Sequence, residues 1–411
     1  MTPASHPSVP VSPEEAERCV RTLRRELAAW ASAPESAVSV VRSPYRFCPL
    51  GAHVDHQLGE VTGLALDRAL LMAFIARDDA LMVVRSRQFP HTAEIPLDRP
   101  PQPRTGDWAD YARGAAYALQ TRLALRRGLT ALVDGYCNAG GLSSSAAAGV
   151  AYLLALETVN DAPMPPVENI ELDRVIENEY IGLDNGILDQ SVILLSRAGH
   201  LTYLDCQSGQ SRLVPLGAGG DVSMVVLFSG LRAPLSGTDY NLRVQECRQA
   251  AAHLLQAAHL PVPARPFLRA VPLDVFARYG HTLPAQLKRR AAHFFGEVTR
   301  VRQGTELWAT GDLEGFGRLV SESGLSSIEN YECGNRYLRS AYEVLCGCPG
   351  VYGSRFSGGG FRGCCVALVR PGCEPEVARE ALSRYLRAHA DMVGRAEAYF
   401  CRSGEGAGFL S

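Results

Sequence analysis

A loop of glycines and serines joins a short apolar run to a long apolar segment in the stretch ALVDGYCNAGGLSSSAAAGVAYLLALETVN. Gly140 and Gly141 let another backbone approach closely, because glycine has no side chain. Ser143, Ser144 and Ser145 follow, and they add hydroxyl and N–H groups where the apolar helix is expected to begin. A helix N-terminus carries free N–H groups and the positive end of the helix dipole, so it favours anions. The pattern predicts a strand, an anion-binding loop and a helix in succession, although a simple helix cap would use the same residues.

Strand-like and helix-like segments alternate along the rest of the chain. Apolar, β-branched runs predict strands at AVSVVRSP, VTGLALDRALLMAFIAR, LMVVRSR, HLTYLDC and VSMVVLFSG. Helical spacing of apolar residues predicts helices at SPEEAERCVRTLRRELAAWA, with Ser12 as its N-cap, at WADYARGAAYALQTRLAL and over most of residues 240–345. The alternation favours a mixed α/β or α+β protein. A length of 411 residues is enough for two domains with separate cores, the second beginning near residue 215.

Composition excludes several classes of protein. A formal net charge of -2 and 20% charged residues give no basic excess that would predict nucleic-acid binding. No apolar run reaches the length of a membrane span, and the first residues lack the apolar core of a signal peptide. The twelve cysteines form no CxxC pair. We therefore expect reduced thiols in a cytoplasmic protein.

The stretch PYRFCPLGAHVDHQLGE places three polar side chains close together after an arginine: Arg46 is followed by His53, Asp55 and His56. Such a group fits a metal site, a catalytic cluster or a cradle for a sugar. A metal site would need more ligands, and the sequence has no further cluster of histidines or cysteines to complete it. The residues by themselves leave the catalytic and sugar-binding interpretations open.

The segment GLSSSAA resembles the phosphate loop of the GHMP kinases, the superfamily that includes galactokinase, homoserine kinase and mevalonate kinase; it lacks the lysine of a Walker A loop. Three other segments resemble galactokinase motifs in the same order along the chain: PYRFCPLGAHVDH, NGILDQS and GSRFSGGGFRGCCVAL. The resemblance implies an α+β fold of two domains with the site in the cleft between them. It implies a mixed α/β domain of the ribosomal-S5-domain-2-like type in residues 1–215 and a ferredoxin-like domain in residues 216–411.

The same resemblance assigns the catalytic and metal-binding residues. Asp189 in NGILDQS matches the base position of the family, and Arg46 matches its partner arginine. A kinase needs a base because an anomeric hydroxyl is a weak acid, and a cation beside the base keeps it ionised and stabilises charge in the transition state. Ser145 and Glu177 match the positions that hold Mg²⁺, which prefers oxygen ligands. Without the motifs, a structural aspartate and an arginine in a surface ion pair would be the simpler interpretation.

The nucleotide is expected at the glycine- and serine-rich loop. The resemblance assigns ATP to the six residues Gly140, Gly141, Leu142, Ser143, Ser144 and Ser145. The segment DWADYARG resembles WANYVKG of galactokinase, so Trp108 and Tyr111 are expected to contact adenine. The alternative is that both are core aromatics of an amphipathic helix.

In galactokinases the turn after the arginine holds the sugar through an acidic residue, a histidine and an aspartate. His53 and Asp55 match the last two, and Gly186 and Tyr240 are expected to contact the sugar as well. Ala52 stands where the acidic residue of the family faces the 6-hydroxyl. A glutamate about 4 Å from a substrate carboxylate would cost about 4 kcal/mol at an effective dielectric constant of about 20. Alanine removes that repulsion and so favours a sugar acid, although a pentose such as arabinose, which lacks carbon 6, would also fit.

The likeness is denser to the plant galacturonokinases than to galactokinases proper, in PLGAHVDHQ, NGILDQS, SGLSSIENYECG, GVYG and SGGGFRGCC. It implies ATP-dependent phosphorylation of D-galacturonic acid at carbon 1. Arg362 replaces a glycine of the galactokinase loop and is the predicted contact for the carboxylate, unless it is a solvated surface arginine. A kinase of galactose or arabinose and a sugar sensor without turnover are the other candidate functions. The intact catalytic and metal-binding residues argue against the sensor.

Overall fold

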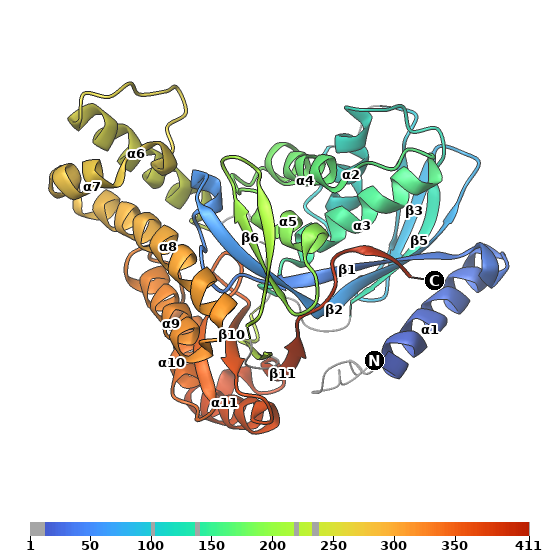
Figure 1. The fold of residues 1–411 in the computed structure, drawn as a ribbon. Coiled ribbons are helices and arrows are strands. Elements are labelled where there is room, and N and C mark those ends of the chain that lie inside the picture. The colour runs from blue at the N-terminus through green and yellow to red at the C-terminus, as the bar shows by residue number, and fades with distance from the viewer. Residues whose placement is uncertain (1–12, 100–102, 136–139, 218–221, 232–237, 411) are drawn as a thin grey trace.

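The computed structural model describes residues 13–99, 103–135, 140–217, 222–231 and 238–410, arranged as two sheets and the helices that cover them (Figure 1). The predicted N-cap Ser12 lies outside these residues. In chain order the helices are α1 (Pro13–Ala31), α2 (Asp110–Gln120), α3 (Ser144–Val159), α4 (Pro166–Val175), α5 (Leu188–Leu195), α6 (Tyr240–Ala257), α7 (Leu273–Tyr279), α8 (Ala285–Thr310), α9 (Leu313–Glu329), α10 (Arg336–Cys346) and α11 (Glu374–Ala388). A π-helical turn, Ile176–Ile181, continues α4.

The first sheet is mixed and contains eight of the described strands. They are β1 (Ser39–Phe47), β2 (Glu60–Ala76), β3 (Leu81–Ser86), β4 (Thr92–Pro96), β5 (Leu129–Gly135), β6 (His200–Asp205), β7 (Ser211–Pro215) and β12 (Gly408–Leu410). The order is β12-β1-β2-β5-β3-β4, and the β6–β7 hairpin pairs with the beginning of β2. Only the β3–β5 pair among them is parallel. The strands predicted from the apolar runs are therefore confirmed.

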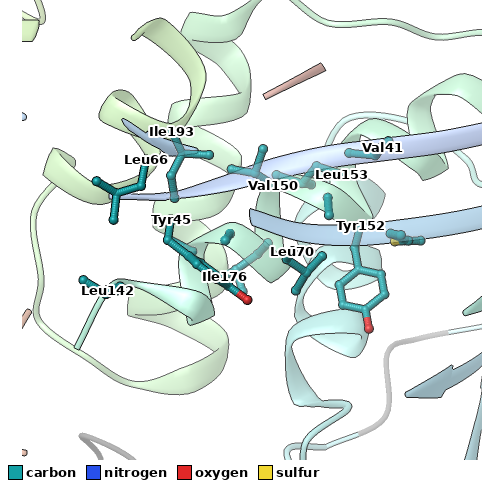
Figure 2. Packing of buried hydrophobic residues seen from close by; sticks show 14 of the residues in the cluster. Val41, Tyr45, Leu66, Leu70, Leu142, Val150, Tyr152, Leu153, Ile176 and Ile193 are labelled. Carbon is teal, nitrogen blue, oxygen red and sulfur yellow. The ribbon is translucent and has the colours of Figure 1, made fainter. Parts of the chain in front are cut away.

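Helix α3 lies at the centre of the first core, against β1 and β2 on one side and α2, α4 and α5 on the others (Figure 2). It is apolar on every face, which is typical of a fully buried helix. Val150 and Leu153 pack near Val41 of β1 and Ile193 of α5. This packing fixes the position of the α3 N-terminus, which is where the glycine- and serine-rich loop ends.

The second sheet is antiparallel and consists, in the described chain, of β8 (Ser223–Phe228), β9 (Val351–Phe356), β10 (Cys364–Val369) and β11 (Glu397–Arg402) in the order β11-β8-β10-β9. Helices α10 and α11 pack against it. The succession strand, helix, strand, strand, helix, strand with this spatial order is the ferredoxin-like topology, as the resemblance implied. The long insertion between β8 and β9 carries α6–α10.

The two parts of the chain share contacts along α8 and at the C-terminus. Helix α8 packs against β2, β6 and β7, and its Trp308 belongs to the core that also contains Val41 of β1. After β11 the chain returns to the first sheet, where Leu410 pairs with Val40 (Figure 1). The predicted domain boundary near residue 215 falls between β7 and β8. The division into domains of residues 1–215 and 216–411 remains a proposal.

Two further observations concern membrane spans and the state of the cysteines. None of the described helices combines the length and the apolar character needed to cross a bilayer. The cysteines in the described residues are all free thiols, and most of them are buried.

Candidate functional site

The loop at residues 140–145 enters α3 as the sequence predicted. Gly141 has φ 89° and Ser143 has φ 57°, so the backbone turns sharply before α3 begins at Ser144. A second glycine-rich loop, residues 357–363 between β9 and β10, packs directly on it: a Cβ on Gly363 would lie 2.6 Å from the carbonyl oxygen of Gly140. The two loops meet because glycines remove the side chains that would separate them.

Arg46 and Asp189 form an ion pair beside these loops. Arg46 lies on β1 and donates from Nε to Oδ1 of Asp189, in the first turn of α5, at 2.7 Å. Its Nη1 also donates to Ser357 Oγ at 3.2 Å and to the carbonyl oxygen of Gly141 at 3.4 Å. Burial alone would lower the pKa of Arg46, but the charge and hydrogen bond of Asp189 raise it, so the guanidinium stays charged. The sequence prediction that these two residues act together is consistent with this geometry.

The second carboxylate oxygen of Asp189 has a partner that the sequence did not predict. Ser143 donates its hydroxyl hydrogen to Oδ2 of Asp189. Ser143 was expected in the anion cradle, and in this structure its hydroxyl faces the predicted base instead. Both oxygens of Asp189 are therefore held, while its side chain stays 23% exposed and accessible to a ligand.

Ser145 and Glu177 lie together on the other side of the loop. Both are hydrogen-bonded to the hydroxyl of Tyr111, and they are hydrogen-bonded to each other. Asn185 adds a bond from Nδ2 to Glu177 Oε2 at 3.3 Å. Burial and the nearby charge of Asp189 raise the pKa of Glu177 to about 7. Tyr111 was predicted as an adenine contact, and its hydroxyl belongs to this polar group.

This polar group suits a hard cation. Hydroxyl and carboxylate oxygens are the ligands that Mg²⁺ prefers, with waters and phosphate oxygens completing its shell. One helical turn before Glu177, Asp173 is fully buried, and neither of its carboxylate oxygens has a hydrogen-bond partner among the described residues. Burial and the charge of Glu177 raise the pKa of Asp173 well above its usual value. A cation beside Glu177 would offset this excess of buried acid.

No group of three or more His, Cys, Asp or Glu side chains within the described ranges is arranged to hold a metal ion. A cation at this position would have the Ser145 hydroxyl and the Glu177 carboxylate as ligands, and Mg²⁺ commonly completes its shell with waters and phosphate oxygens.

The turn at residues 51–57 carries the residues predicted to hold a sugar. Asp55 lies against Gly186, where a Cβ would be 2.7 Å from its Oδ2, so only glycine fits at this position. Burial, and then the charge of Asp189, raise the pKa of Asp55 to about 6. His53 has φ 61° and stacks on Tyr331 with ring centroids 4.2 Å apart. Burial lowers the pKa of His53 well below its usual value, so its imidazole is neutral.

Tyr240 and His56 form the next part of this wall. Tyr240 begins α6, and its ring meets the ring of His56 edge-on at 6.1 Å. His56 also shares a hydrogen bond of 3.0 Å with the hydroxyl of Tyr331. The structure therefore brings His53, Asp55, Gly186 and Tyr240 together, as the sequence predicted, and adds Tyr331, which the sequence did not single out.

Two side chains of helix α8 bond the backbone of the 51–57 turn. His293 donates from Nε2 to the carbonyl oxygen of Ala52 at 2.9 Å. One helical turn later, Glu297 accepts the N–H of Gly51 at 2.7 Å. Both side chains are almost fully buried. The sequence analysis did not single out His293 or Glu297, because nothing local links them to this turn.

Trp108 and Arg362, the predicted contacts for adenine and for the carboxylate, lie outside these groups. Trp108 is half-buried and stacks in parallel with the exposed Phe89, with centroids 6.0 Å apart. Arg362 is exposed and directly precedes Gly363, which packs on Gly140. Contact of Trp108 with adenine and of Arg362 with a carboxylate remain predictions.

Comparison with protein families gives two matches. The model described as GHMP kinases N terminal domain matches residues 110–197, and the model described as GHMP kinases C terminal matches residues 305–390. The first match covers α2, α3 and Asp189, and the second covers α9, α10 and the 357–363 loop.

Individual relatives agree with these matches. A galacturonokinase of Arabidopsis thaliana is 42% identical over 95% of this chain and 98% of its own length. A galactokinase of Chloroflexus aggregans is 33% identical over 89% of this chain and 92% of its own. Among solved structures, Lactococcus lactis galactokinase complexed with galactose superposes with a TM-score of 0.86, 25% identity and coverage of 95% of this chain and 100% of that one. Methanococcus jannaschii mevalonate kinase, at 13% identity and a TM-score of 0.61 over 90% of this chain and 99% of that one, shares the fold.

Proposed function

Because this chain is a sugar kinase of the GHMP kinase family, we propose that it transfers the γ-phosphoryl group of ATP to the anomeric hydroxyl of D-galacturonic acid, giving D-galacturonate 1-phosphate. The observation that carries the choice of sugar is Ala52. It stands in an otherwise complete sugar turn, between Gly51 and His53, and its buried methyl group adds no negative charge where carbon 6 is expected. The 42% identity to a galacturonokinase supports the same choice.

Asp189 accepts the proton of the anomeric hydroxyl in this proposal. The sugar hydroxyl takes the place of the Ser143 hydroxyl at Oδ2, while Arg46 keeps Oδ1. Arg46 holds Asp189 ionised and in position, and its charge stabilises the negative charge that develops during transfer. The gain comes mostly from positioning and electrostatics, as in other phosphoryl transfers.

The nucleotide occupies residues 140–145. The N–H groups at the start of α3 face its phosphates. Trp108 and the ring of Tyr111 contact the adenine, while the Tyr111 hydroxyl is hydrogen-bonded to Ser145 and Glu177.

Ser145 and Glu177 hold Mg²⁺ together with the ATP phosphates. When bound, the ion neutralises charge on the phosphate oxygens. Ser145 supplies a hydroxyl oxygen and Glu177 a carboxylate, and Tyr111 and Asn185 orient them through the hydrogen bonds already described.

The sugar hydroxyls bind to the 51–57 turn. Asp55 and neutral His53 offer an acceptor and a ring that can donate or accept, and Tyr240 closes the wall. Gly186 leaves the space in which Asp55 lies.

A kinase for a neutral sugar is the second candidate function. The 33% identical galactokinase and the galactose complex of the 25% identical one favour it, because His53 and Asp55 would serve galactose equally. The test is a substrate panel with ATP and galacturonate, galactose, glucuronate and arabinose. We expect the highest kcat/KM with galacturonate, and a preference for galactose or arabinose would overturn the proposal in favour of the second candidate. Binding of a sugar without turnover of any would indicate a sensor.

A further inference from the structure

The guanidinium of Arg46 is bonded by three segments that lie far apart in the chain. Its Nε donates to Asp189 at 2.7 Å, and its Nη1 donates to Ser357 Oγ at 3.2 Å and to the carbonyl oxygen of Gly141 at 3.4 Å. Asp189 is the predicted base, and Gly141 belongs to the 140–145 loop. Ser357 comes from the second glycine-rich loop, after β9. The C-terminal part of the chain is therefore in direct contact with the catalytic pair.

Ser357 is fixed in place by the elements on both sides of it. It is 1% exposed, and its N–H donates to the carbonyl oxygen of Cys364, at the start of β10, at 3.1 Å. A Cβ on Gly141 would lie 3.0 Å from the carbonyl oxygen of Ser357, and one on Gly358 would lie 2.8 Å from that of Gly141. The second sheet and the 140–145 loop thus leave the serine little room to move.

The hydroxyl of Ser357 is the better of the two acceptors at Nη1. Hydrogen bonds from N–H to oxygen are usually 2.7–3.2 Å long, so the contact with Ser357 lies within this range and the contact with Gly141 lies beyond it. The Arg46 side chain is only 4% exposed, so water would not readily replace a lost acceptor. Arginine is long and flexible, and a single bond from Nε to Asp189 would leave the guanidinium plane free to turn. A second acceptor at Nη1 fixes that plane.

We propose that Ser357 is a positioning residue for phosphoryl transfer, because it fixes the Arg46 guanidinium against Asp189 and beside the 140–145 loop. This inference rests on the proposed function, since it takes Arg46 and Asp189 as the catalytic pair. Electrostatic stabilisation of a transition state depends on charges that are already in place before the reaction, and small displacements are costly. Through one buried hydroxyl, the second sheet contributes to turnover without contact with the substrate.

The experiment removes the acceptor and measures kcat and KM separately, with ATP and the sugar that the wild type uses best. Ser357→Ala should lower kcat by about 10-fold, the effect of losing a hydrogen bond to a charged group. The KM values for sugar and ATP should change by less than about 2-fold, because the residue contacts neither. Ser357→Thr keeps the hydroxyl and should recover most of kcat. Ser357→Cys has a similar size and only a weak acceptor, so it should resemble the alanine variant.

Ser354 of β9 provides a matched control. It lies three residues before Ser357, it is fully buried, and its Oγ has no hydrogen-bond partner among the residues that the structure describes. Ser354→Ala therefore removes a buried hydroxyl from the same strand without breaking a bond to Arg46, and it should keep the wild-type kcat. An equal loss of kcat in this variant would show that any change in β9 disturbs the site, and it would overturn the proposal.

A double-mutant cycle tests whether Ser357 acts through Arg46. Arg46→Met keeps a long side chain and removes the donors, so adding Ser357→Ala to it should lower kcat by no more than about 2-fold further. Wild-type kcat in Ser357→Ala, a Thr variant as impaired as the Ala variant, or losses that multiply in the double variant would each overturn the role of Ser357. Wild-type kcat in Arg46→Met would instead show that Arg46 is not catalytic. That result would contradict the proposed function itself, so the two failures are distinguishable.

Discussion

Arg46 Nε lies 2.7 Å from Asp189 Oδ1, although 143 residues separate the two in the chain. β1 carries the arginine and the first turn of α5 carries the aspartate, and both elements pack on α3. The charge of this pair is therefore fixed beside the loop at residues 140–145. Turnover is expected to depend on this ion pair.

Replacing Asp189 by Asn keeps the shape of the side chain and removes its charge and its ability to accept a proton. We expect kcat to fall by about 10²-fold or more, while sugar binding is affected less. Steady-state kinetics together with calorimetric titration of the sugar measure the two effects separately. Near-normal kcat in this variant would show that Asp189 is not the base.

Ser145→Ala and Glu177→Gln each remove an oxygen ligand or its charge from the proposed Mg²⁺ site. Each variant should need more Mg²⁺ for half-maximal rate, at saturating ATP and sugar. Glu179→Gln, two residues further along, is the matched control and should show the wild-type dependence. If both site variants respond to Mg²⁺ as the wild type does, the ion binds elsewhere.

Ala52→Glu should reverse the substrate preference rather than weaken the enzyme in general. A carboxylate at this position repels that of galacturonate, so kcat/KM for galacturonate should fall by about 10²- to 10³-fold, or about 3–4 kcal/mol. Galactose should lose far less, since its 6-hydroxyl gains a charged acceptor.

Overpacking is the competing reason for a loss in that variant. Ala52→Gln adds nearly the same volume without charge, and the galacturonate-to-galactose ratio of kcat/KM separates the two effects. The interpretation is wrong if Glu and Gln depress galacturonate equally, or if the ratio stays constant.

Asp55 should impose an acidic limb on the pH profile of kcat/KM. Burial and the charge of Asp189 raise its pKa from an ordinary value of 3.8 to about 6, so its protonated form persists to higher pH than usual. Sugar binding by the ionised form should therefore weaken as pH falls through about 6 and stay level above it. Asp55→Asn should have lower kcat/KM and no such limb, and a limb that survives in this variant belongs to another group.

The raised pKa of Asp55 also affects stability. Its contribution to stability decreases as pH rises, whereas its contribution to sugar binding increases. Asp55 favours the native state at low pH, where it is protonated, and this contribution is lost as pH rises through about 6. The difference in the free energy of unfolding, Asp55→Asn minus wild type, should accordingly increase from pH 4 to pH 8. Urea denaturation at each pH measures this difference. A constant difference across this range would contradict the shift.

His293→Leu should loosen the 51–57 turn from behind. It leaves the carbonyl oxygen of Ala52 buried without its donor, at a cost of about 1–3 kcal/mol. The KM for the sugar should rise more than kcat falls, and the KM for ATP should change little. His293→Gln keeps a donor and should recover part of the loss, whereas equal defects in both variants would indicate that volume alone matters.

Much of the fold followed from local patterns. The strands β1, β2, β3, β6 and β8 and the helices α1, α2 and α3 lie where apolar spacing predicted them, with shifts of a few residues at their ends. The ferredoxin-like topology and the family were also predicted correctly, from motifs in order along the chain. The predicted site residues on the 51–57 turn and in the 140–145 loop lie close to Asp189 in space.

The sequence by itself determined which segments are buried and which carry reactive groups, because periodicity and turn residues act over a few neighbouring positions. Only the tertiary structure decided that Ser143 faces Asp189 and that His293 holds Ala52. Each of these pairings joins elements that are distant along the chain. Their geometry depends on how α3, α5 and α8 pack, and packing is settled by the whole core and not by any local pattern.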